Sequence, residues 1–420
     1  MNSGNSGGSH PSSTRRVMDR RGFLAVGGAA LAALAPQKCC WAGDLPRDVK
    51  ITRIVGFDLV SRRPKLVGNN SRLGIHGDHT TDRMVRLFTN AGIEGLGHCR
   101  APQEAVAALL GRNPLDSFAD AELAIRSPLG AATMPLWDLV GKVLGKPVYQ
   151  LLGAKGSERI PVYDGSIYFA DLLPEHAARW QDRFKEEIDI GLARGHRAFK
   201  IKVGRGAKWM PAEEGFQRDK EVLQVIRGHA GPEVRLGIDA NNGYDLERTK
   251  RLFTDLPDIN LKFAEEMFPE QVDQCLELKA FFANQKLETL VADGETQDNL
   301  DVFKPFIEAR AIDVYQADMN RFGIEGILAE AAMVRPQGGL VGPHNWGSLV
   351  GYYTILHVGR AISNFYIAEN DPADSDVLLA DGYVIKEGHA TVPEAPGFGL
   401  RIDEAKFAAE IKPRFDLRSE

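Results

Sequence analysis

Residues with chemically useful side chains recur at regular spacing through the second half of the chain. They lie at or just after the ends of short apolar runs that recur about every 30 residues, which is the length of one strand–helix unit in an eightfold barrel. The carboxyl ends of such strands meet on one face of the barrel, so we expect one site built from all of them. The series is Lys200, Lys202, Asp239, Asn241, Glu265, Glu295, Asp318, His344 and Glu369.

Three carboxylates in this series indicate a divalent metal ion. Asp239, Glu265 and Glu295 follow consecutive apolar runs and bring anionic oxygens with no thiol nearby. This donor set suits Mg²⁺, which keeps waters and a substrate oxygen in its remaining positions. Without a cation, burial of three mutually repelling acids is costly. We therefore expect Mg²⁺ as the cofactor.

The segment Lys200-Ile201-Lys202 predicts two ammonium groups on one face of a strand, because side chains alternate with a period of two. Two like charges this close depress one lysine pKa and make a neutral amine available as a base. Alternating lysines are also common on exposed edge strands. An interior strand of a parallel barrel has no solvent-exposed face, and this favours the catalytic interpretation.

A histidine and two further carboxylates complete the series. Asp318 and His344 end neighbouring apolar runs, so the carboxylate can orient the imidazole and raise its basicity. A lone histidine is more often structural, but the nearby Asp318 favours a dyad. Glu369 ends the eighth run. If it is desolvated and protonated, it can donate to a substrate oxygen as negative charge develops there.

Short β-like runs alternate with helical stretches from residue 160 onward, which is typical of βαβ units and a parallel sheet. An open doubly wound sheet is the alternative, but no glycine-rich phosphate loop supports it. Before residue 160, the sequence predicts strands over 49–99 with a hairpin turn at 90–92, a long polar loop over 62–80, and helices over 103–152. The eight runs are 160–163, 198–203, 234–239, 261–266, 289–293, 312–316, 340–342 and 364–367.

Two parts of the sequence resemble the enolase superfamily, and within it the mandelate racemase-like subgroup. In the site series, the Lys-x-Lys pair is similar to the subgroup's second-strand base motif, and the other residues are similar to its metal ligands, His–Asp dyad and eighth-strand electrophile. Glu265 is followed by Glu266, and either could be the ligand. We prefer Glu265 because it comes first, as in the family. The segment 134–153 is similar to the helix that joins the family's capping domain to its barrel.

The resemblance implies an α/β fold with two domains. A modified (β/α)7β TIM-type barrel over 161–384 would carry an α+β N-terminal capping domain over 49–160, completed by residues 385–420. The cap loop over 62–80 would close over the mouth of the barrel and select the substrate. The candidate substrate-binding residues are Arg72, His76 and His79 on this loop and Asn241 on the barrel rim.

The resemblance also implies a reaction: removal of the proton α to a carboxylate, giving an enediolate. We expect dehydration of a sugar acid, an aldonate or aldarate, to a 2-keto-3-deoxy acid. Two alternatives stay open. The same residues could racemise or epimerise a 2-hydroxy acid, or an exported protein could bind a sugar acid without turning it over. Relatives assemble as dimers or octamers, so a homo-oligomer is expected.

The amino-acid composition argues against two classes of binding partner, nucleic acid and membrane. The chain has 420 residues, 51 Lys plus Arg against 57 Asp plus Glu, and a net charge of −6, which argues against nucleic acid. No apolar stretch is long enough to span a membrane. Residues 1–43 predict a disordered leader and a twin-arginine-type signal peptide around Arg20-Arg21, hence the periplasm; an ordinary secretory signal is the alternative. Of four cysteines, the separated Cys99 and Cys275 predict neither a disulfide framework nor a zinc site.

Overall fold

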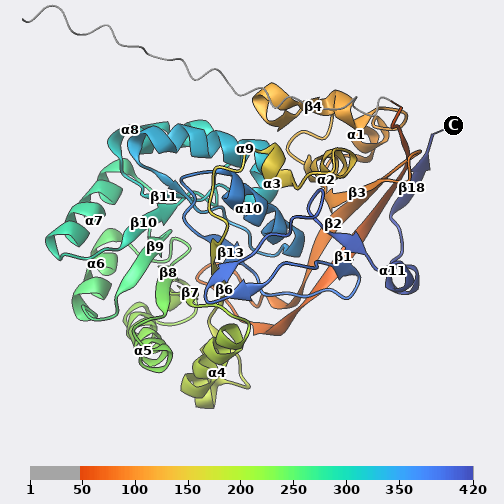
Figure 1. The fold of residues 1–420 in the computed structure, drawn as a ribbon. Helices are drawn as coiled ribbons and strands as arrows, with labels where there is room; N and C mark the ends of the chain where they lie inside the picture. Colours follow the sequence, from red (N-terminus) through yellow and green to blue (C-terminus); the bar gives the residue numbers. More distant parts are fainter. Residues whose placement is uncertain (1–47, 420) are drawn as a thin grey trace, which may run out of the picture. The chain divides into compact units, whose positions relative to one another are not determined.

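Two large sheets organise residues 48–419, the part of the chain that the computed structural model describes (Figure 1). One is a four-stranded antiparallel sheet, here called the cap sheet, and the other is the barrel. The predicted leader over 1–43 and its twin-arginine signal lie outside the described residues. None of the helices within residues 48–419 has the length and apolar character that a membrane crossing requires.

The cap sheet has the strand order β18-β1-β2-β3. Its turn between β2 and β3 confirms the hairpin predicted at 90–92, because Gly92 adopts a φ of +70° and its N–H donates to the Thr89 carbonyl. In this order, β18, the last strand of the described residues, pairs with β1, the first, and Phe415 lies opposite Gly56. The strands are β1 (Ile51–Val67), β2 (Gly77–Thr89), β3 (Glu94–His98) and β18 (Phe415–Arg418).

The prediction of a loop over 62–80 is wrong, because the loop is much shorter. Arg62 pairs with His79 and the ladder continues to Val67 opposite Gly77, so only residues 68–76 form the tip of the hairpin. The sequence did not predict a strand over residues 62–67, because two side chains on its inward face are charged. Arg63 and Lys65 are buried and paired with acids of the barrel, so the expected apolar alternation is missing.

The helical prediction over 103–152 is also only partly correct. The structure has three short α-helices here, α1 (Gln103–Ala107), α2 (Met134–Val143) and α3 (Val148–Leu151), separated by short 3-10 turns and a small hairpin of β4 (Phe118–Ala119) and β5 (Ala124–Ile125). Gly111 and Gly130 take positive φ values of +74° and +61°, which interrupt helical geometry. Helix α2 lies against β3.

The barrel is a ring of eight parallel strands. The ladder runs from β12 through β11, β10, β9, β8 and β7 to β6, and β13 pairs with the other edge of β6. A parallel bridge between Val341 and Phe365 closes the ring. The run predicted over 364–367 thus provides the bridge, and strand β13 itself comes later. The strands are β6 (Ile160–Ile167), β7 (Ala198–Lys202), β8 (Arg235–Asp239), β9 (Leu261–Glu265), β10 (Leu290–Asp293), β11 (Val314–Tyr315), β12 (Leu340–Val341) and β13 (Ala368–Asn370).

Helices connect successive strands and cover the outside of the barrel (Figure 1). This arrangement confirms the predicted α/β barrel with an N-terminal cap. The helices are α4 (Trp180–Ala193), α5 (Ala212–Ala230), α6 (Leu246–Asp255), α7 (Val272–Asn284), α8 (Lys304–Ala309), α9 (Met319–Val334) and α10 (Leu349–Ala361).

The C-terminal residues divide between the two sheets, so they do not complete the cap as one unit. A hairpin of β15 (Ile385–Lys386) and β16 (His389–Ala390) pairs antiparallel with the start of β6 and extends the barrel sheet. Strand β14 (Leu378–Leu379) pairs with β17 (Arg401–Ile402), and helix α11 (Glu404–Glu410) leads to β18. Only β18 joins the cap sheet.

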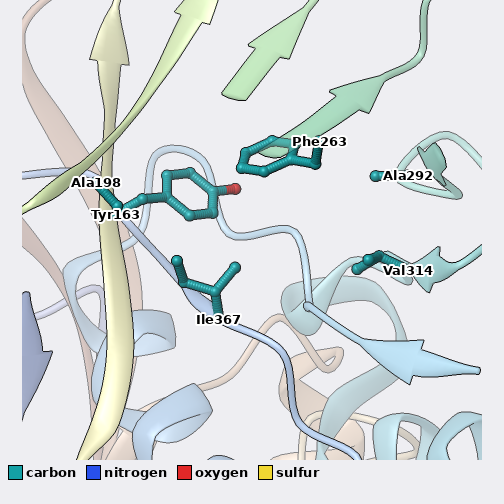
Figure 2. Packing of buried hydrophobic residues seen from close by; sticks show 6 residues of the cluster. All are labelled: Tyr163, Ala198, Phe263, Ala292, Val314 and Ile367. Atoms are coloured by element: carbon teal, nitrogen blue, oxygen red, sulfur yellow. The ribbon is translucent and has the colours of Figure 1, made fainter. Parts of the chain in front are cut away.

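Figure 2 shows a layer of buried apolar side chains inside the barrel. Along the strands, this layer comes just before the charged residues of the site. Because side chains alternate along a strand, the residue two positions further on shares the same face. Phe263 is followed by Glu265 and Ile367 by Glu369, so one strand face supplies both the apolar layer and the charged one. The layer consists of Tyr163, Ala198, Phe263, Ala292, Val314 and Ile367.

Candidate active site

Three carboxylates from three adjacent strands converge at the carboxyl end of the barrel. Asp239 ends β8, Glu265 ends β9, and Glu295 follows β10. One oxygen from each lies within 4.8 Å of the others, and Asp239 and Glu265 are fully buried. These are hard, anionic donors without a thiol among them, and this fits Mg²⁺. Buried acids this close repel one another, so the set itself favours a cation.

The structure separates the two consecutive glutamates. Glu265 accepts hydrogen bonds from Lys200 (2.6 Å) and Gln316 (2.8 Å) and belongs to the carboxylate cluster. Glu266 has a φ of +39° and accepts from the Asn241 side chain at 3.2 Å. Burial and the neighbouring acids raise the pKa of both carboxyls, to about 8 for Glu265 and about 9 for Glu266, so position in the cluster distinguishes the two glutamates and charge does not.

Both lysines of β7 point into the barrel and contact the carboxylate cluster. Lys200 Nζ lies 2.6 Å from Glu265 and 2.9 Å from Glu369. Lys202 forms a short ion pair with Asp239 and donates to the Asn241 side chain at 2.9 Å. Asn241 therefore connects the base position to Glu266 and Glu295, whose oxygens its amide reaches at 3.2 Å.

The expectation that neighbouring positive charges lower a lysine pKa is wrong for Lys200. Burial does lower the pKa of this ammonium group, but the carboxylates of Glu265 and Glu369 outweigh burial and hold the pKa well above its usual value. The prediction considered the two lysines without the acids around them. In the structure, Lys200 is a fixed positive charge.

Asp318 and His344 lie side by side on the opposite flank of the cluster. His344 Nδ1 is 2.7 Å from Asp318 Oδ2, and His344 Nε2 is 3.2 Å from Glu295. Asp318 is also the N-cap of α9, accepting from the Arg321 N–H at 2.8 Å, so its carboxylate is held in place. Burial lowers the pKa of His344, but Glu295, Glu369 and Asp318 outweigh it and raise the pKa to about 10. The imidazole is therefore protonated at pH 7.

Glu369 is ionised, which contradicts the expected protonated donor. Burial raises its pKa, but Lys200 and His344 outweigh burial and bring the pKa to about 2. The carboxylate accepts from the Asn345 backbone N–H at 2.8 Å. The positive partner 2.9 Å away is the reason that the carboxyl does not hold its proton.

The cap-loop candidates divide into three different positions. His79 lies on β2, exposed and beside Asp78, so it does not reach the site. His76 lies between cap and barrel, and its Nδ1 is 3.1 Å from Trp346 Nε1. Arg72 lines a cavity of about 620 Å³ that also borders Asn241, Glu295, Asp318 and His344. This cavity is the mouth of the site.

Hydrogen bonds fix the hairpin tip, residues 68–76, over this mouth. Ser71 Oγ donates to the Ala240 carbonyl at 2.6 Å, immediately after the metal-cluster residue of β8. Arg63 forms a buried two-point ion pair with Asp371, at 2.7 and 2.6 Å, and also donates to the carbonyls of His76 and His79. The cap is thus bound to the barrel beside the site.

Sequence reasoning missed several residues that shape the site. Gln316 ends a predicted strand and could have been found by the same rule as its neighbours. Asn345 and Trp346 follow His344, but nothing in the sequence shows that one holds Glu369 through its backbone and the other contacts the cap. Arg100 and Arg321 also line the cavity, and no spacing signal marks them.

The architecture and the site match known proteins. Residues 183–406 match the family model described as Enolase C-terminal domain-like. The chain belongs to the enolase superfamily, as its sequence motifs indicated. It is 30% identical over 283 residues to the D-gluconate/D-galactonate dehydratase of Picrophilus torridus, covering 66% of this chain and 69% of that protein. It is also 30% identical over 279 residues to the arabinonate dehydratase of Saccharolobus solfataricus, covering 65% and 69%.

Solved structures give the same result. A galacturonate dehydratase from Geobacillus sp., crystallised with D-galacturonate and 5-keto-4-deoxy-D-galacturonate, is 33% identical, with a TM-score of 0.77 and coverage of 86% of this chain and 97% of that one. A mandelate racemase/muconate lactonizing protein from Geobacillus sp. Y412MC10, crystallised with magnesium and tartrate, is 32% identical, with a TM-score of 0.78 and coverage of 87% and 96%.

Proposed function

We propose that the protein dehydrates a sugar acid, removing the proton α to the carboxylate and the hydroxyl on the β carbon to give a 2-keto-3-deoxy acid. One topological relationship carries the proposal. The three cluster strands, β8, β9 and β10, are consecutive in the barrel; Lys202 comes from the strand before them, and the Asp318–His344 dyad from the two strands after them. A substrate carboxylate at the cluster therefore lies between a base and an acid.

Asp239, Glu265 and Glu295 hold Mg²⁺ in this proposal. When bound, the ion supplies positive charge beside the substrate carboxylate, which lowers the cost of removing the α proton. Lys200 adds a second, permanent positive charge at the same place, because its ammonium group lies 2.6 Å from Glu265. Both charges stabilise the enediolate that forms in the transition state.

The chain's own residues move two protons. Lys202 Nζ accepts the α proton, and the electron pair of that C–H bond moves into the enediolate. The bond from the β carbon to its hydroxyl then breaks, both electrons leave with oxygen, and protonated His344 donates a proton so that water departs. The enol product tautomerises to the ketone. Proton exchange with solvent then resets both side chains for the next turnover.

The activities named for the relatives favour dehydration over racemisation or epimerisation. Three of those reported above are dehydratases of sugar acids. The pair of compounds crystallised with the Geobacillus enzyme differ by loss of water across carbons 4 and 5, where carbon 5 is next to the carboxylate. The proposed reaction has the same bond changes.

The test follows the α proton and the water separately. The Mg²⁺-loaded protein is incubated with aldonic, aldaric and uronic acids in D₂O and followed by ¹H NMR and a keto-acid assay. We expect keto-acid formation from at least one acid. Deuterium at the α carbon without keto acid supports racemisation or epimerisation instead. No exchange and no product with any acid, despite binding, supports a non-catalytic binding protein.

Two variants separate the roles of acid and base. Lys202→Ala removes the base, so both deuterium exchange and dehydration fall by at least about 100-fold. His344→Asn keeps a polar side chain at the dyad position but has no proton to donate, so dehydration falls while α-proton exchange continues. If exchange continues in Lys202→Ala, the assignment of Lys202 as the base is wrong, and if exchange is lost equally in both variants, His344 does not act as the acid alone.

Export by the twin-arginine route is a separate part of the proposal, and it is supported by the sequence alone. Arg20-Arg21-Gly22-Phe23-Leu24 precedes a short apolar run. Cell fractionation of the wild type and an Arg20→Lys/Arg21→Lys variant tests the route. We expect the variant to stay in the cytoplasm. Continued export of the variant supports an ordinary secretory signal.

A further inference from the structure

Three arginines line the cavity at the mouth of the site, and they come from three separate parts of the chain. Arg72 lies on the hairpin tip of the cap, Arg100 follows β3, and Arg321 lies in the first turn of α9. We call them the distal arginines. The mechanism above uses none of them.

Within residues 48–419, the distal arginines have no carboxylate partner of their own. Among the described residues, the side chains of Arg72 and Arg100 form no hydrogen bond or ion pair. Arg321 donates from Nη1 to the neutral carbonyls of Thr296 (2.9 Å) and Gln297 (2.7 Å). Asp318 and Glu295, which also line the cavity, both contact His344. The cavity mouth therefore carries unbalanced positive charge.

At the reacting end, in contrast, each carboxylate has a basic partner. The carboxylates there contact two lysines and one histidine, and three of them would also hold the divalent cation. The substrate carboxylate is accommodated there without help from the distal arginines. The reacting-end groups are Asp239, Glu265, Glu295, Asp318, Glu369, Lys200, Lys202 and His344.

The backbone holds at least two of the distal arginines in place. Lys208 Nζ donates to the Arg72 carbonyl at 2.8 Å, and Trp209 donates to the Asn70 carbonyl at 2.6 Å, so the tip cannot swing freely. Arg321 is fixed by the helix whose N-cap is the catalytic Asp318. Exposed arginines are usually solvated individually, but these converge on one cavity of about 620 Å³, within the range of small-molecule sites.

We propose that the substrate carries a second anionic group at the end remote from the reacting carboxylate, and that the distal arginines bind it. This rests on the proposed function and narrows its substrate class to a dicarboxylic sugar acid. Guanidinium groups match a carboxylate through paired N–H donors, and charge-assisted bonds of this kind are the strong ones. A phosphate monoester offers related chemistry and is the other source of such an anion.

The experiment compares substrates that differ only at the remote carbon. D-galactarate is paired with D-galactonate, and D-glucarate with D-gluconate, with 6-phosphogluconate as the phosphate arm. Binding to the Mg²⁺-loaded protein is measured by calorimetry and turnover by the keto-acid assay. We expect the diacid of at least one pair to bind and react at least about 100-fold better than its monoacid, with a KM that rises with salt.

Variants locate the anion site. Arg72→Gln and Arg100→Gln should each reduce the diacid-to-monoacid ratio of kcat/KM about tenfold or more, mainly through KM. Arg72→Lys keeps the charge but loses the paired donors, so it should restore part of the ratio. Arg112→Gln, an exposed arginine outside the cavity, is the matched control and should leave the ratio unchanged.

The outcomes separate this inference from the proposed function. Equal binding and turnover of diacid and monoacid, or equal losses for both in the arginine variants, overturns the distal anion site while dehydration stands. Preferred binding of the diacid without any keto acid supports the anion site and contradicts dehydration. Preference for 6-phosphogluconate over D-glucarate supports the anion site and replaces the remote carboxylate with a phosphate.

Discussion

Trp346 of the barrel donates its indole N–H to Nδ1 of His76 on the cap, across 3.1 Å. An indole nitrogen can only donate, so His76 Nδ1 must accept and the ring proton must reside on Nε2. Burial, with the charge of Lys202, lowers the pKa of His76 to about 4, so the ring stays neutral at pH 7. Trp346 also stacks on Tyr168, with ring centroids 4.7 Å apart. One contact thus fixes both the hairpin tip and a histidine tautomer.

Replacing Trp346 with phenylalanine should weaken substrate binding. Trp346→Phe keeps an aromatic ring for Tyr168 but removes the N–H, which loosens the tip over the mouth. A net hydrogen bond contributes about 1 kcal/mol, so we expect KM to rise about five- to tenfold with a smaller change in kcat. Steady-state kinetics on the substrate identified by the acid screen provide the measurement.

A second tryptophan serves as the control for this prediction. Trp209 donates to the Asn70 carbonyl on the same tip, at 2.6 Å. Trp209→Phe removes a comparable bond without touching His76. If it raises KM as much as Trp346→Phe, the effect comes from the position of the tip alone and the tautomer of His76 contributes nothing.

Magnesium should stabilise the fold through Glu265 and not through Glu266. A ligand at 100 times its Kd adds about 2.7 kcal/mol to the free energy of unfolding, so Mg²⁺ should raise Tm of the wild type measurably. Glu265→Gln removes one carboxylate ligand of the cluster and should abolish the shift. Glu266 lies outside the carboxylate cluster, and Gln is nearly isosteric with Glu, so Glu266→Gln should retain it.

Metal removal checks the same assignment by activity. EDTA should abolish turnover, and added Mg²⁺ should restore it in the wild type and in Glu266→Gln but not in Glu265→Gln. Calorimetric titration with Mg²⁺ alone gives the affinity without a substrate. Loss of Mg²⁺ binding in Glu266→Gln with retention in Glu265→Gln would reverse the two assignments.

Glu330 should make the fold less stable as pH rises. Burial raises its pKa from 4.5 to about 8; one oxygen accepts from the Ala317 N–H at 3.0 Å and the other has no partner. Between these pKa values the folded state holds a proton that the unfolded state releases, so the free energy of unfolding falls by about 1.4 kcal/mol per pH unit. Glu330→Gln lacks this slope, and its advantage over the wild type should grow from pH 5 to pH 8.

Urea unfolding at several pH values measures this difference. Glu308→Gln, an exposed glutamate on α8, is the control and should show no pH-dependent difference from the wild type. A constant offset between Glu330→Gln and the wild type at every pH would contradict the proposed proton on Glu330.

Gly237 should be intolerant of a side chain. A Cβ at this position would lie 2.2 Å from the ring of Phe263, which is two residues before Glu265 on β9. Gly237→Ala must displace that ring, and overpacking typically costs about 1–3 kcal/mol. We expect a lower Tm and weaker Mg²⁺ binding. Phe263→Leu in the same chain should recover part of both, and failure to do so would place the damage elsewhere.

The sequence predicted the barrel well because its strands are apolar runs at regular spacing, and their ends carry the chemistry. The cap was harder. Arg63 and Lys65 lie on the inward face of β1, where apolar residues are expected, because their partners Asp371 and Glu187 are distant in the sequence. A pattern within one segment cannot show a buried ion pair between two.

The protonation states of the site residues also could not be predicted from short stretches of sequence. The Lys-x-Lys motif indicated two adjacent cations, but the state of Lys200 depends on Glu265 and Glu369, which β9 and β13 bring to it. The same pairing keeps Glu369 ionised. Residue types and spacing therefore identify the participants, whereas their protonation follows from the assembled barrel.

The pairing of β18 with β1 sets an order for assembly. Asp416 forms a two-point ion pair with Arg53, 363 positions earlier, so the cap sheet gains this outer strand only after residues 415–418 have left the ribosome. Until then, the long strand β1 presents an open edge, which is a template for pairing with other chains. A variant that lacks β18 would keep that edge open in the folded state, and we expect it to self-associate.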